Sequence, residues 1–89
     1  MSKADVNLND LEALLRQLQA FNASFISEWN RMKSSWSQLN STWNDQQKEK
    51  FRRDWEVTQR DMERYIQKSN DYISFIQGRV NAAREYEGS

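Results

Sequence analysis

The chain has 89 residues, no cysteine and no histidine, and its 13 basic and 13 acidic residues cancel. It therefore has no disulfide framework, and it lacks the commonest general base and metal ligand. A net charge of zero argues against polyanion binding as the main role. With 37% hydrophobic and 12% aromatic residues, the chain is too apolar for a disordered segment. We expect one small, soluble, self-assembling helical domain, residues 1–89.

The first ten residues, MSKADVNLND, contain no apolar run of the kind found in signal peptides. Nothing in the sequence approaches the length of a membrane span. We therefore expect a cytoplasmic protein.

An apolar seam at steps of three and four residues predicts a first helix over about residues 6–40. The seam comprises Leu8, Leu11, Leu15, Leu18, Asn22, Phe25, Trp29, Met32, Trp36, Leu39 and Trp43. This is a heptad a/d pattern, which packs against a neighbouring helix. Leu14 and Phe21 widen the stripe on one flank and Ile26 widens it on the other. A stripe this wide needs more than one neighbouring helix.

Asn22 is the single polar residue of this seam. It can set register or partner, as a buried asparagine does in coiled coils. Alternatively, Phe21 rotates inward and Asn22 points to water. The tryptophans of the seam could form a ligand-binding row, but aromatic residues that continue a leucine seam are more typical of a core.

The stretch LNSTWNDQQKEKFRRDW, residues 39–55, contains neither glycine nor proline, yet it joins two helical patterns. We expect a turn over residues 41–44, with either Thr42 or Asn44 as the cap of the second helix. Asp45 then lies in the first helical turn, where the helix dipole favours a negative charge. No glycine is required if the backbone turns without a positive φ. We expect Trp43 to fold over the tip and pack against Phe51 or Trp55.

A second helix is predicted over about residues 45–86. Its stripe comprises Trp55, Met62, Ile66, Ser69, Ile73, Ile76, Val80 and Ala83, and a parallel row comprises Phe51, Thr58, Tyr65, Tyr72 and Tyr86. Gly78 interrupts good helix formers, and we read it as a surface glycine or a close helix approach. The short connection predicts an antiparallel helical hairpin, an all-α fold.

A lone hairpin of this size leaves the outer flanks of both stripes exposed. We therefore predict a dimeric four-helix bundle, formed by a second copy or by a paralogous hairpin. The residues expected in its core or dimer seam are Leu14, Leu15, Leu18, Phe21, Phe25, Ile26, Trp29, Met32, Trp36, Met62, Tyr65, Ile66, Tyr72, Ile73 and Ile76.

The turn motif Trp43-Asn44-Asp45, followed by Phe51 and Trp55, resembles the WXG superfamily, short helical hairpins with a Trp-x-Gly turn and later aromatics. The resemblance covers the whole chain in architecture and about five positions in motif. It implies a bacterial protein of type VII (ESX) secretion that works as a dimer and is secreted without a cleaved signal. It also implies a secretion ATPase or an effector as a further partner.

The sequence departs from the family pattern in two ways. Asp45 stands where the family has glycine, so this is a Trp-x-Asp variant. The family's export signal, Tyr-x-x-x-Asp/Glu, is missing, because Ser69 and Ile76 lie four residues after Tyr65 and Tyr72. Either a partner carries the signal, or the protein is not exported by this route.

Other functions remain as alternatives. A coiled-coil assembly adaptor unrelated to secretion shares every one of these features. RNA binding through Lys48, Arg52 and Arg53 is less favoured, because acidic residues interrupt this patch. We expect no enzyme, no metal and no cofactor, since the acidic pairs are spaced i,i+2 and do not share a helical face.

Overall fold

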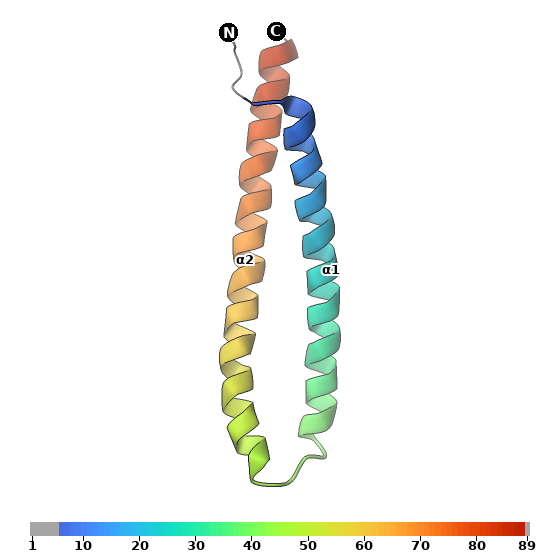
Figure 1. Cartoon of the computed structure of the whole chain (residues 1–89), viewed down its shortest axis with the longest axis vertical. Helices are drawn as coiled ribbons and strands as arrows, with labels where there is room; N and C mark the ends of the chain where they lie inside the picture. Colours follow the sequence, from blue (N-terminus) through green and yellow to red (C-terminus); the bar gives the residue numbers. More distant parts are fainter. Residues whose placement is uncertain (1–5, 89) are drawn as a thin grey trace.

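The chain folds into two long antiparallel helices that form a hairpin (Figure 1). The computed structural model describes residues 6–88, with side chains as far as Tyr86. Helix α1 spans Leu8–Asn40 and helix α2 spans Gln47–Gly88. The start of α1 and the end of α2 lie at the same end of the hairpin, and the connecting turn forms the opposite tip. The prediction of an all-α hairpin is confirmed.

Side-chain oxygens set both ends of α1. At its start, the Asn7 side chain accepts a hydrogen bond of 3.1 Å from the backbone N–H of Asp10. At its end, the hydroxyls of Ser41 and Thr42 donate to the carbonyls of Gln38 and Leu39, at 2.8 and 3.3 Å. Such local bonds compete with the helical ladder, so the helix ends without a glycine.

The expected caps of α2 are wrong. Neither Thr42 nor Asn44 caps it; instead the Asp45 carboxylate accepts the backbone N–H of Gln47 at 2.9 Å. The helix consequently begins at Gln47, two residues later than predicted. Asp45 can reach this N–H because its side chain precedes the helix, where a carboxylate satisfies an orphan donor and the helix dipole. No residue in the described chain has a positive φ, as the glycine-free turn requires.

The core is thin and lies along the line where the helices meet. Near the open end, Leu11, Leu15 and Val80 form a buried cluster with Leu8, Ile73 and Ile76 packed against it. Farther along, Asn22, Trp29, Trp55 and Ser69 are also buried, and Ala83 is buried near the open end.

Two members of the predicted seam lie outside this core. Met32 and Leu39 are 49% and 47% exposed. A straight α-helix drifts by about 20° per heptad relative to a 3.5-residue repeat, so later positions of the row rotate away from the neighbouring helix.

The hairpin measures 66 × 17 × 14 Å, and its radius of gyration is 19.8 Å. A compact domain of this length has a radius of about 12 Å. The molecule is therefore a rod two helices wide, in which no apolar side chain is far from solvent.

Candidate protein-interaction face

Polar contacts between the helices lie along one edge of the hairpin. They are Glu12–Arg84 at 2.9 Å, Asn22–Asn70 at 2.9 Å, Lys33–Glu63 at 3.6 Å and Asn40–Lys48 at 2.7 Å. Most of these residues recur at multiples of seven along their helices, so they share one side, which we call the polar edge. Its contacts join α1 and α2 along nearly the whole length of the rod.

The opposite side is apolar and open. On α1 it comprises Leu14, Leu18, Phe21, Phe25, Met32 and Leu39, and on α2 it comprises Phe51, Tyr65, Tyr72 and Phe75; we call this set the apolar face. Three of its aromatic rings are half or more exposed, namely Phe75 at 66%, Phe21 at 56% and Tyr72 at 51%. Large apolar side chains gathered in this way are typical of interaction surfaces, whether for a protein, a membrane or a ligand.

Three aromatic rings form a cluster on this face near the middle of α1. Phe25 and Tyr65 have ring centroids 4.8 Å apart, and Phe21 lies 6.2 Å from Phe25 and 6.3 Å from Tyr65. Each such pair contributes about 0.5–1.5 kcal/mol beyond area burial. We call Phe21, Phe25 and Tyr65 the aromatic triad. It holds the two helices together while leaving Phe21 largely exposed.

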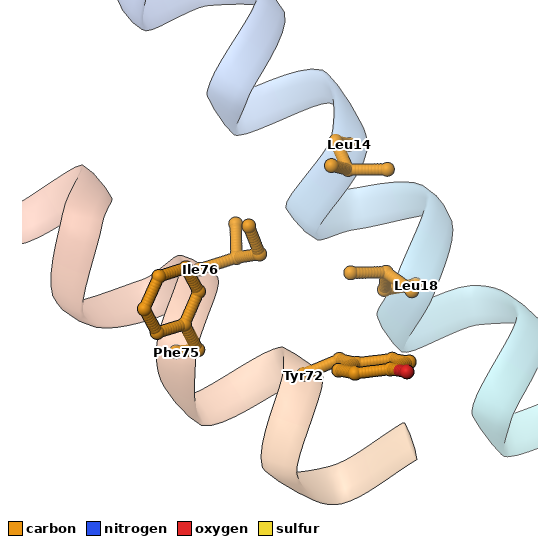
Figure 2. A pocket seen from close by; sticks show the side chains of 5 residues that line it. All are labelled: Leu14, Leu18, Tyr72, Phe75 and Ile76. Carbon is orange, nitrogen blue, oxygen red and sulfur yellow. The ribbon is translucent and has the colours of Figure 1, made fainter. Parts of the chain in front are cut away.

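Next to the triad, toward the open end, the apolar face is hollowed. Figure 2 shows the hollow, with Leu14 and Leu18 extending from α1 and Tyr72, Phe75 and Ile76 from α2. Its volume is about 200 Å³. An apolar cavity of about 150 Å³ is large enough for a benzene molecule. The hollow can therefore receive one large apolar side chain.

Five aromatic residues form a chain of contacts from the middle of the hairpin to its tip. Ring centroids lie 5.4 Å apart for Trp29–Trp55, 6.0 Å for Trp36–Trp55, 5.2 Å for Trp36–Phe51 and 5.7 Å for Trp43–Phe51. The expected packing of Trp43 against the second helix is thus made through Phe51. The Trp43 indole also donates to the Asp45 carboxylate at 2.8 Å, so one carboxylate caps α2 and fixes the tip indole.

Asn22 is buried in the core, and Phe21 is exposed, so the alternative in which Phe21 turns inward is wrong. The Asn22 amide donates to the Asn70 side chain at 2.9 Å, while the buried Asn22 oxygen has no hydrogen-bond partner in the described chain. The indole nitrogens of Trp29 and Trp55 are likewise buried without a partner. A buried polar atom without a hydrogen-bond partner lowers the stability of the folded state, so such atoms are rare in protein cores.

The remaining residues of the predicted core or dimer seam differ in how deeply the structure buries them. Leu15 is buried, and Ile26, Trp36, Met62, Ile66, Ile73 and Ile76 are half-buried. Ile26 lies on the side of the polar edge, away from the exposed aromatic residues. Asn44 is exposed at the tip.

Sequence reasoning missed the residues that bridge the helices, Asn70 among them, because pairing across a hairpin depends on its alignment. It also missed Phe75, although an aromatic residue three positions after Tyr72 signals a wider stripe on that flank.

Other kinds of site are not found in the described residues. No group of acidic, histidine or cysteine side chains between residues 6 and 88 could hold a metal ion. No helix within that range is long and apolar enough to cross a membrane. Near the tip, a hydrogen bond from Arg52 lowers the pKa of the exposed Glu49 carboxyl from its ordinary value.

In comparisons with known proteins, no family model matches the chain, and no curated protein or solved structure is detectably similar to it. The shape and chemistry of the apolar face therefore carry the functional interpretation. Such a surface, with a hollow beside an exposed aromatic cluster, is suited to packing against helices of another protein.

Proposed function

We infer that the chain is a non-enzymatic protein-interaction module that works as a dimeric four-helix bundle. Two hairpins join through their apolar faces, while the polar edges remain in water. The observation that carries this proposal is the exposure of the apolar face along one side of the rod. Because the polar edge already joins α1 to α2, the apolar face is available for a second hairpin.

The exposed area supports a stable partner rather than an isolated hairpin. The accessible surface is 6825 Å². A compact monomer of this mass has about 5,500 Å². The excess reflects the rod shape of the hairpin, and a standard interface would cover roughly 800 Å² on each partner. The four exposed aromatic residues Phe21, Tyr65, Tyr72 and Phe75 alone supply roughly 400 Å², at about 200 Å² for a whole ring residue.

We assign this module to the assembly of type VII secretion complexes. The support is the resemblance of Trp43-Asn44-Asp45, Phe51 and Trp55 to the WXG turn pattern, together with the hairpin architecture. Asp45 stands at the position of the glycine in that pattern. Its carboxylate caps α2 and accepts a hydrogen bond from the Trp43 indole. The partner is a second copy or a paralogous hairpin, and a secretion ATPase or an effector binds the completed bundle. Because Ser69 and Ile76 lie four residues after Tyr65 and Tyr72, neither tyrosine begins a Tyr-x-x-x-Asp/Glu signal, and the partner would supply one.

Substitutions on the apolar face test the interaction directly. Phe21→Ser combined with Tyr65→Ser should raise the dimer dissociation constant by more than a hundredfold in sedimentation equilibrium. The matched control is Gln67→Ser, which changes an exposed residue two positions after Tyr65, on a different side of α2. The control should remain a dimer. Equal effects of the two changes would contradict the assignment of the face.

The secretion assignment has a separate test. A tagged chain expressed in a bacterium with a type VII system should reach the culture medium only when its partner and the secretion ATPase are present. Release that is independent of the ATPase, or no release with any paralogous hairpin, would remove this part of the proposal and leave an assembly adaptor.

A further inference from the structure

The connection between α1 and α2, at the tip in Figure 1, departs from helical hydrogen bonding over only a few residues. Ser41 still has αR backbone angles. The backbone N–H of Trp43 donates to the Leu39 carbonyl at 2.8 Å, which is the i to i−4 pattern of an α-helix. Because α2 begins at Gln47, the departure is confined to residues 44–46, which we call the break.

The break contains no residue that an α-helix would exclude. The sequence has no proline, and its first glycine is Gly78. No described residue has a positive φ. The turn is held by side chains instead, chiefly by the Asp45 carboxylate, which accepts the Gln47 backbone N–H at 2.9 Å and the Trp43 indole N–H at 2.8 Å. Such local bonds can be exchanged for helical ones, since asparagine and aspartate are weak helix formers but not helix breakers.

The buried stripes of α1 and α2 are in phase along a continuous helix. At 3.6 residues per turn, Leu11 and Ala83 are separated by about 20 whole turns, and Leu15 and Val80 by about 18 whole turns. The residues that face one another across the hairpin would therefore lie on the same side of a single straight helix.

The phase is also kept nearer the tip. The buried polar residues Asn22 and Ser69 are separated by about 13 whole turns. Trp29 and Trp55, the buried pair closest to the tip, are separated by about 7.2 turns, so the stripe shifts there by only about a fifth of a turn. A straightened chain would thus present one nearly continuous buried stripe.

Two straightened chains can exchange their first helices. We propose that the chain has a second folded state, in which the break becomes helical and two chains pair antiparallel, with α1 of each against α2 of the other. Contacts such as Glu12–Arg84 and the buried cluster around Val80 are then made between chains. Because the interface is the same in both states, the exchange costs little beyond the bonds of the break. It uses the interface between α1 and α2 rather than the apolar face, so it goes beyond the proposed function.

The exchanged state doubles the apolar face. Leu18 and Tyr72 are separated by about 15 whole turns, as are Phe21 and Phe75, so these exposed residues also share a side of the straight helix. The two-fold axis of an antiparallel pair is perpendicular to the plane of the two helices, and it keeps both apolar faces on one side. The result is a rod with a hollow in each half, which can bridge two partner proteins where the hairpin binds one.

Energy transfer within one chain distinguishes the two states. Because the chain has no cysteine, Ala13→Cys with Ala82→Cys provides two exposed dye positions near the open end. In the hairpin the dyes lie at one end of a rod 17 × 14 Å in cross-section. In the straight helix they are roughly 100 Å apart, from 1.5 Å per residue. A large excess of unlabelled chain ensures that transfer reports distances within a chain.

The labelled mixture is refolded from urea at two concentrations, because an exchange between two chains increases with concentration. Refolding at roughly 1 millimolar should give dimers that have lost energy transfer, whereas refolding at roughly 1 micromolar should preserve transfer. Transfer that stays high at both concentrations would overturn the exchange. If those molecules are dimers, the proposed pairing of intact hairpins is unaffected; if they are monomers, that pairing is refuted as well.

Substitutions in the break test its role. Asp45→Ala should raise the association constant for exchange at least tenfold, because it removes the cap of α2 and the bond to the Trp43 indole. Asp54→Ala, the same change at an exposed position within α2, should stay within twofold of the wild type. Asn44→Pro should lower the constant at least tenfold, because proline interrupts a continuous helix. Equal exchange by Asp45→Ala and Asp54→Ala would overturn the proposal.

Discussion

Replacing Asn22 by leucine should stabilise the protein, although it removes the only hydrogen bond that joins two amide side chains across the described hairpin. The Asn22 oxygen is buried and has no hydrogen-bond partner in the described chain. A buried polar group left unpaired costs about 1–3 kcal/mol, whereas a typical hydrogen bond contributes about 1 kcal/mol net. Asn70 is exposed, so its amide can return to water.

The sum of these free-energy contributions favours leucine at position 22. Burying a leucine side chain adds roughly 2 kcal/mol, so we expect Asn22→Leu to raise the free energy of unfolding by about 1–3 kcal/mol. For a domain of this size, each kcal/mol shifts Tm by about 4–8 °C. Asn70→Ala should have the opposite effect and lower the free energy by about 1–2 kcal/mol, because it leaves the buried Asn22 amide without its acceptor.

Thermal and urea unfolding followed by circular dichroism measures these changes. Protein concentration must be the same for every variant, because it would affect the stability of the proposed dimer. Asn30→Leu is the matched control, since Asn30 is exposed on the same helix and the same substitution there should change the free energy by less than about 0.5 kcal/mol. A lower Tm for Asn22→Leu than for the wild type would refute this reasoning about the buried oxygen.

Three further predictions concern single residues elsewhere in the hairpin. Asp45→Ala should lower the free energy of unfolding by about 1–2 kcal/mol, because α2 loses its cap, while the neighbouring Asn44→Ala changes it by less than about 0.5 kcal/mol in the same urea assay. Gly78→Ala should raise it by about 1 kcal/mol, because nothing lies within 4 Å of the added Cβ; a decrease would show a close contact there. A carbon-detected NMR titration should place the Glu49 pKa below 4.5, and Arg52→Ala should return it toward that value. Since that pKa is lowered by folding, the stabilisation by Glu49 is present at neutral pH and is lost as pH falls through the lowered pKa; an unchanged pKa in Arg52→Ala would contradict the pairing.

The sequence was sufficient to predict both helices and the glycine-free turn, because their apolar periodicity is long and the capping residues are concentrated at residues 41–45. It could not identify the cap itself, because Thr42, Asn44 and Asp45 all have suitable oxygens and only the path of the backbone selects Asp45. The exposure of Met32 likewise depends on the gradual rotation of α1 away from its neighbour, which a strict heptad count does not contain.

The candidate face was predictable only in part. The exposed flank of Leu14, Phe21, Tyr65 and Tyr72 follows from heptad spacing alone. The hollow and the polar edge do not, because both depend on which residue of α1 lies opposite which residue of α2. That alignment is fixed by contacts far apart in the chain, such as Glu12–Arg84 and Asn22–Asn70.

The mass of the protein in solution tests most directly the proposal that the apolar face packs against a second hairpin. Sedimentation equilibrium of the wild-type chain at 10–100 micromolar should give twice the monomer mass of 10.7 kDa, with helical circular dichroism throughout. A folded species of 10.7 kDa over this whole range would contradict the account.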